Sequence, residues 1–128
     1  MPEIRIFATK TFTKWQHKSG LTDQSLINAV QEMRSGIVDA HLAKGLVKKR
    51  VAHPGRGKRS SSRTLVATRF EDRWFFIFGF MKNEKSNITA EEMQWLKDFS
   101  KRLLSLSNHE LSMAMEAGEL NEIKPKNA

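Results

Sequence analysis

The segment TLVATRFEDRWFFIFGFM, residues 64–81, decides the fold class of this chain. It contains two runs rich in β-branched and aromatic residues, Thr64–Phe70 and Trp74–Met81, with the polar pair Glu71 and Asp72 between them. This pattern predicts two antiparallel strands joined by a tight turn. The almost continuous apolar character of the second run predicts a central strand that is covered, at least in part, on both faces.

Two more strands are predicted on the N-terminal side of this pair. Leu46–Ala52 is strand-like and is separated from the pair by a loop rich in basic residues, so the three runs predict an antiparallel meander. Glu3–Thr9 alternates apolar and polar side chains, which is typical of a half-buried strand. We expect Ile37–Gly45 to be turn and extended chain.

Two helices are predicted between the first strand and the meander. Thr11 or Thr13 can cap a short helix that ends at Gly20. Thr22 can cap a second helix, for which Gly36 supplies the left-handed stop.

Two further helices are predicted after the meander, because the capping-box pattern occurs at Thr89–Glu92 and again at Ser107–Glu110. The tail, from about 119 to 128, is polar and is predicted to be frayed. The element order β-α-α-β-β-β-α-α predicts a single domain over residues 1–128. Its fold class is α+β, with N-terminal and C-terminal helices packed on a small antiparallel sheet.

Composition narrows the possible functions. The chain has no cysteine, so disulfides and thiolate metal sites are excluded. The four histidines have no metal-ligand spacing, and we expect neither a metal nor another cofactor. No apolar run is long enough for a signal peptide or for the ~20 residues that span a bilayer. We therefore expect a cytoplasmic protein with no membrane partner.

Positive charge is concentrated around the loop that precedes the decisive segment. The chain has 22 basic and 14 acidic residues, a net charge of +8, and residues 44–70 hold nine basic and no acidic ones. The remaining 13 basic residues face all 14 acidic residues, a net charge of −1. Gly55 and Gly57 would let backbone amides approach an anion. The alternative is a solvated surface loop, but the charge density favours contact with phosphate or nucleic acid.

Two cations from different strands are predicted to lie close together. In a meander, the end of the last strand lies near the start of its neighbour, so Lys82 and Arg63 could face one phosphate. The alternative is that Lys82 is simply a lysine in a turn.

Several segments resemble RelE/HigB-type toxins of bacterial type II toxin–antitoxin systems. They are KKRVAHPGRGK (48–58), RTLVA (63–67) and FIFGFMKNEKSNI (76–88), together with FTKW (12–15) and LSNHEL (106–111). The resemblance covers residues 12 to about 123 and implies a small RelE-like α+β domain with a curved antiparallel sheet. The implied activity is ribosome-dependent, metal-independent endoribonuclease cleavage of mRNA, in which a 2′-hydroxyl attacks the adjacent phosphate and translation stops. The implied partners are mRNA, the ribosome with its rRNA, and a cognate helix-turn-helix antitoxin. Operator DNA would be contacted only by the antitoxin and not by the toxin itself.

The resemblance also places functional positions on this chain. The positions that match the family blocks are Lys48, Lys49, Arg50, Arg56, Lys58, Arg63, Lys82 and Asn83. Two positions depart from the pattern. Many members have an aromatic residue, commonly Tyr, where this chain has Ser62, and an arginine is common where it has His53.

The proposed chemistry assigns roles to these residues. The cleavage passes through a crowded dianionic phosphorane, which arginine can stabilise because its guanidinium pairs with two phosphate oxygens. Arg63 is the first candidate for this role and Arg56 the second, with Lys82 as a further cation. The base is either Lys58, whose pKa neighbouring cations would lower, or His53, whose ordinary pKa of about 6.5 already suits the task.

The remaining residues of the block are expected to bind RNA or the ribosome. They are Lys48, Lys49, Arg50, Arg59 and Asn83. Phe78 and Phe80 could stack on bases, although core packing is the expected role. Two alternatives remain open: a non-catalytic nucleic-acid-binding module, and an interaction module whose basic groove receives an antitoxin segment.

Overall fold

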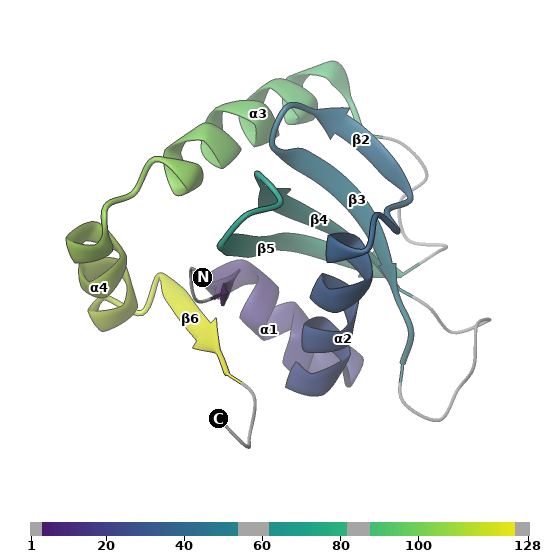
Figure 1. The fold of residues 1–128 in the computed structure, drawn as a ribbon, viewed down its shortest axis with the longest axis horizontal. Coiled ribbons are helices and arrows are strands. Elements are labelled where there is room, and N and C mark those ends of the chain that lie inside the picture. Colours follow the sequence, from purple (N-terminus) through teal and green to yellow (C-terminus); the bar gives the residue numbers. More distant parts are fainter. Residues whose placement is uncertain (1–3, 54–61, 82–87, 125–128) are drawn as a thin grey trace.

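The computed structural model describes residues 4–53, 62–81 and 88–124. Within these ranges the chain forms one six-stranded sheet and four helices (Figure 1). In chain order they are β1 (Arg5–Thr9), α1 (Lys10–Ser19), α2 (Asp23–Arg34), β2 (Ala40–Ala43), β3 (Leu46–Val51), β4 (Ser62–Thr68), β5 (Arg73–Met81), α3 (Ala90–Leu104), α4 (Asn108–Glu116) and β6 (Leu120–Ile123).

The sheet has the strand order β2-β3-β4-β5-β1-β6. Consecutive antiparallel pairing of β3, β4 and β5 confirms the predicted meander, and β5 is a central strand as predicted. The predicted α+β fold is confirmed. The sheet is nevertheless mixed, not purely antiparallel, because β1 lies parallel to β5 with Arg5 opposite Arg73. Alternation within residues 3–9 indicates a strand but does not specify the direction of its neighbour.

Hydroxyl side chains mark the starts of the helices. The predicted N-caps that the structure confirms are Thr22, Thr89 and Ser107. The prediction that Thr11 or Thr13 caps α1 is wrong, because Thr9, the last residue of β1, is the cap. Its hydroxyl accepts a hydrogen bond from the Phe12 N–H at 3.1 Å and donates one to the Ile77 carbonyl at 2.9 Å. One side chain therefore ties the β1–α1 junction to β5.

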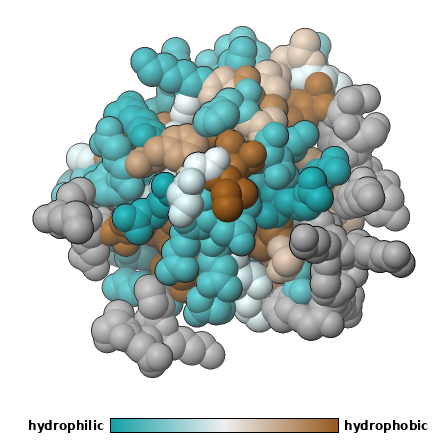
Figure 2. All heavy atoms as spheres, turned by 45° about the vertical axis from the view of Figure 1, so that its right-hand side comes forward, coloured by the Kyte–Doolittle hydropathy of each residue, from teal (hydrophilic) through white to brown (hydrophobic). Residues whose placement is uncertain are grey.

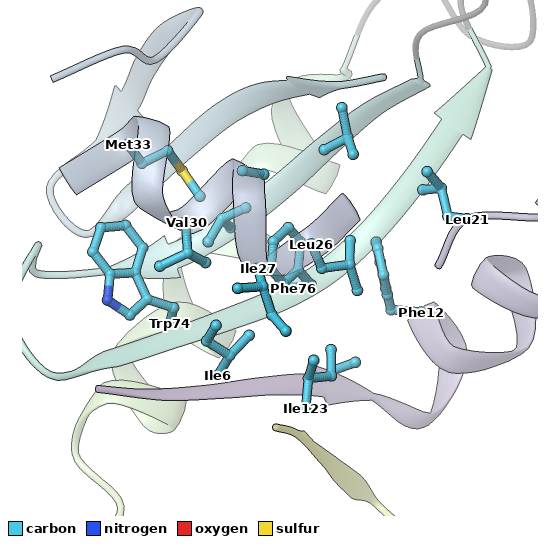
Figure 3. Packing of buried hydrophobic residues seen from close by; sticks show 14 of the residues in the cluster. Ile6, Phe12, Leu21, Leu26, Ile27, Val30, Met33, Trp74, Phe76 and Ile123 are labelled. Atoms are coloured by element: carbon cyan, nitrogen blue, oxygen red, sulfur yellow. The ribbon is translucent and has the colours of Figure 1, made fainter. Parts of the chain in front are cut away.

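Helices cover both faces of the sheet. The face under α1 and α2 carries one buried cluster, in which side chains from both helices point toward the strands (Figure 3). Its largest members include Phe12, Leu26, Met33, Trp74 and Phe76. The opposite face carries a second cluster under α3 and α4, which includes Phe7, Phe75, Ile77, Leu96, Leu103 and Leu111. We call these two sides of the sheet the α2 face and the α3 face.

Two edge strands were not predicted. The expected extended segment before β3 contains β2, which pairs with β3. The expected frayed tail contains β6, which pairs antiparallel with β1 and buries Leu120 and Ile123. Arg5 donates two hydrogen bonds to the Glu122 carboxylate, at 2.9 and 3.1 Å. These bonds, with the charges of Arg5 and Lys124, hold the pKa of Glu122 below its ordinary value, against the effect of partial burial.

None of the helices in the described ranges is long and apolar enough to cross a bilayer.

Candidate nucleic-acid interface

Two rows of side chains cross the α3 face at the end of the sheet that leads into the basic loop. Strand register places Arg50, Arg63 and Phe80 side by side on β3, β4 and β5. The next row on the same face contains Lys48, Leu65 and Phe78. Leu65 and Phe78 belong to the cluster under α3, which fixes the side of the sheet on which both rows lie. Cations are therefore on β3 and β4, and aromatic rings on β5.

The arginine pair is electrostatically suited to an anion. Arg63 is half-buried, and the Arg50 side chain is 56% exposed, with its Nε 3.6 Å from Asp39. Arg50 and Arg63 are directly opposite each other on neighbouring strands, so one phosphate could accept hydrogen bonds from both guanidinium groups, with Asp39 as the present partner of Arg50. On the side of the molecule that Figure 2 shows, hydrophilic side chains predominate, and apolar side chains form only small separate patches.

Lys49 does not join this row. It was predicted to contact RNA with its neighbours, but it points to the α2 face and its side chain is only 4% exposed. Its Nζ lies 2.7 Å from a Glu32 carboxylate oxygen on α2. The salt bridge gives Lys49 a structural role between β3 and α2, because an ammonium in this position needs a partner for its charge.

His53 is also separated from Arg63. Its Nε2 lies 2.5 Å from the Ser62 hydroxyl, which donates to the Met81 sulfur at 3.1 Å. His53 and Ser62 are buried on the α2 face, whereas Arg63 projects to the α3 face. The geometry therefore does not favour His53, one of the two predicted candidates for the base, if Arg63 holds the phosphate. The two positions that depart from the family pattern form a hydrogen bond with each other.

An aromatic cleft lies beside the two rows, and the sequence patterns did not predict it. It has a volume of about 340 Å³ and lies between β4, β5 and α3. Phe78 and Phe80 line it from the sheet, and Trp95 lines it from α3 with half of its surface exposed. The spacing of Trp95 four residues before Phe99 on a helix is the signal that could have indicated a stacked pair there.

A protein-family model matches almost the whole chain. The model of the RelE toxin of the RelE/RelB toxin–antitoxin system matches residues 4–123. The chain belongs to the RelE toxin family. The match runs from the start of β1 to the end of β6, so it includes the two edge strands that sequence patterns missed. No curated protein matches the chain.

As a RelE-family toxin, the protein is the toxin component of a toxin–antitoxin system, a class whose members pair with antitoxins and are generally ribonucleases.

Five of its predicted site residues lie outside the described residues, namely Arg56, Lys58, Arg59, Lys82 and Asn83. The strand ends that flank them are adjacent, since Ser62 is opposite Met81. Across residues 4–53, 62–81 and 88–124, no three His, Asp or Glu side chains gather in a way that could hold a metal ion.

Proposed function

We propose that this RelE-family toxin is a metal-independent endoribonuclease that cleaves mRNA on the ribosome and so inhibits translation. A ribose 2′-hydroxyl attacks the adjacent phosphate, which leaves a cyclic phosphate and a free 5′-hydroxyl. The observation that supports this most directly is the Arg50–Arg63 pair on the α3 face, beside exposed aromatic surface. The site of action would be the cytoplasm, where ribosomes translate.

Arg63 is the residue best suited to the transition state. Its place within the sheet fixes the backbone from which the guanidinium extends on the α3 face, and the planar fork of arginine matches phosphate geometry. Two parallel N–H groups can hold two phosphate oxygens while negative charge develops on the phosphorane. Arg50 adds a second cation one strand away. In the proposal, Arg56 and Lys82 contribute further positive charge.

The proton acceptor is proposed to be Lys58. His53, the other candidate, is buried on the α2 face and bound to Ser62, so a proton would have to cross the sheet to reach it from the Arg63 row. Lysine requires a lowered pKa to act as a base near pH 7, and neighbouring cations lower it. Lys48, Arg50, Arg59 and Asn83 would hold mRNA or ribosomal RNA.

The proposed protein partner is a cognate helix-turn-helix antitoxin. It would neutralise the toxin, and the complex would contact operator DNA through the antitoxin alone. The toxin itself would recognise RNA.

The test is primer extension on an mRNA that is being translated in a purified system. We expect the wild-type toxin to produce discrete cleavage products, and Arg63→Ala to reduce the rate about 10²- to 10³-fold, as loss of one preorganised charge donor typically does. Arg34→Ala, an exposed arginine at the end of α2, is the matched control and should cleave normally. Thermal unfolding should show that both variants remain folded.

A folded wild-type protein that binds RNA with a steep salt dependence yet cleaves nothing would refute the enzymatic proposal. It would favour the alternative of a non-catalytic nucleic-acid-binding module. Binding to an antitoxin without any effect on RNA would favour the interaction module instead.

A further inference from the structure

We propose that the aromatic cleft on the α3 face is a nucleobase subsite, in which Trp95 stacks on one base of the RNA whose phosphate Arg63 holds. The inference rests on the proposed function and adds to it the place where a base is bound. It is carried by three observations: the volume and lining of the cleft, the packing of the tryptophan ring, and the cations on the neighbouring strands.

The cleft has the size and lining of a site for one planar ring. Its volume of about 340 Å³ lies at the lower end of the roughly 300–1,000 Å³ that ligand pockets span. Its walls are predominantly apolar and include Leu65, Phe78, Phe80, Ile88 and Leu96. An antitoxin helix would instead need an elongated groove with several anchor positions along it. The volume and the apolar lining favour a base over a peptide.

Trp95 is held in place and still exposed. Its ring stacks on Phe99 with centroids 4.9 Å apart and an interplanar angle of 22°. On the sheet side, Phe78 lies 5.7 Å from it in a tilted arrangement. Half of the Trp95 surface nevertheless remains accessible. A ring that is supported by two neighbours and exposed on its remaining surface is the arrangement with which proteins stack on unpaired bases.

The cations lie where the phosphate of the same nucleotide would be. Arg63 adjoins two residues that line the cleft: Phe80, directly opposite on β5, and Leu65, two positions along β4 on the same face. Opposite neighbours in a sheet are about 5 Å apart and residues two positions apart on one strand about 6.5–7 Å, distances within the reach of an arginine side chain. Arg50 lies one strand further out. The one acidic residue of the described lining, Glu92, is on α3, so the phosphate is directed toward β4.

The position of Trp95 also bears on the absence of an aromatic residue at position 62. An aromatic residue at that position is common in the family, but here residue 62 is buried on the α2 face. Trp95 supplies an aromatic surface on the face that carries Arg63.

The first experiment measures binding of a short RNA to the free toxin. The probe is an RNA trinucleotide with 2′-O-methyl riboses, which cannot be cleaved by 2′-hydroxyl attack. Trp74 is fully buried and Trp15 half-buried, so quenching of intrinsic fluorescence should come mainly from Trp95. We expect quenching in the wild type. Trp95→Leu should weaken binding roughly tenfold, as measured by competition with a labelled trinucleotide, and Trp95→Phe should retain most of the affinity. Phe70→Leu, an exposed aromatic in the turn between β4 and β5, is the control and should bind normally.

The second experiment separates this inference from the proposed function. In the translated-mRNA assay, Trp95→Leu should lower kcat/KM, whereas Trp95→Phe should not. Normal cleavage by Trp95→Leu, or no quenching of the wild type at millimolar trinucleotide, would overturn the base subsite while leaving the nuclease proposal intact. A wild type that fails to cleave but is quenched by the trinucleotide would overturn the nuclease alone. Unchanged RNA binding with weakened antitoxin binding in Trp95→Leu would reassign the cleft to the protein partner.

Discussion

Replacement of Gly79 by alanine should lower the stability of the fold, whereas the same substitution in a strand usually raises it. Alanine is ordinarily preferred to glycine inside a strand by about 0.5–1 kcal/mol, because glycine loses more backbone freedom on folding. In this protein, however, the Trp15 ring lies directly over Gly79. A Cβ at residue 79 would lie 2.3 Å from two indole carbons and 2.7 Å from a third. Such overlap requires the ring or the strand to move, and overpacking of this kind costs about 1–3 kcal/mol.

Urea unfolding of a double-mutant cycle tests this explanation. We expect Gly79→Ala alone to lower the free energy of unfolding by about 1–3 kcal/mol. In the Trp15→Leu background the same change should be neutral or stabilising, because the ring that blocks the methyl group is gone. The coupling energy between the two sites should therefore exceed about 1 kcal/mol. A neutral Gly79→Ala, or an equal loss in both backgrounds, would refute the reasoning.

Two further predictions concern ion pairs away from the proposed RNA site. Because Arg5 lowers the pKa of Glu122, this carboxylate stabilises the fold above its unfolded pKa of about 4.3, and the contribution is lost as pH falls through the lower folded value. Glu122→Gln should therefore cost about 1 kcal/mol at pH 7 and converge with the wild type in acid, as measured by urea unfolding between pH 2 and 7. Lys49→Met should leave stability within about 1 kcal/mol and mRNA cleavage unchanged, whereas Glu32→Ala should destabilise by leaving the Lys49 ammonium without its partner. A cleavage defect in folded Lys49→Met would show that Lys49 contacts RNA.

The parts of the fold that sequence predicts well are those with local signals. Alternation and β-branched residues indicate β3, β4 and β5, and hydroxyl caps indicate where α2, α3 and α4 begin. The missed parts depend on contacts between distant segments. In NEIK, Ile123 is apolar among polar neighbours, and its burial follows from pairing with β1 at the opposite end of the chain. Thr9 was missed as a helix cap for a related reason, because it ends a strand and caps a helix at once.

The candidate site is predictable only where strand alternation is applied strictly. Lys49 stands between Val47 and Val51 on the same side of β3, so its assignment to the α2 face could have been inferred from these residues. The acidic partner could not, because Glu32 comes from α2. Trp95 was not predicted as a site residue. Helical periodicity identifies its neighbour Leu96 as part of the buried face of α3, but it does not indicate which surface lies next to the exposed ring of Trp95.

A stretch of basic residues in a sequence is therefore not the same as a basic surface. Acidic residues are absent from residues 44–70, yet Glu32 and Asp39 from outside this range pair with Lys49 and Arg50. Strand geometry then separates Ser62 from Arg63, although they are adjacent in sequence. Because residue 62 forms a hydrogen bond with His53 on the α2 face, an aromatic contact for the RNA that is proposed to bind at Arg63 has to come from another element. The α3 helix supplies one in addition to Phe80 of β5, and the exposed ring of Trp95 is thus the feature on which the proposed RNA affinity of this toxin should depend.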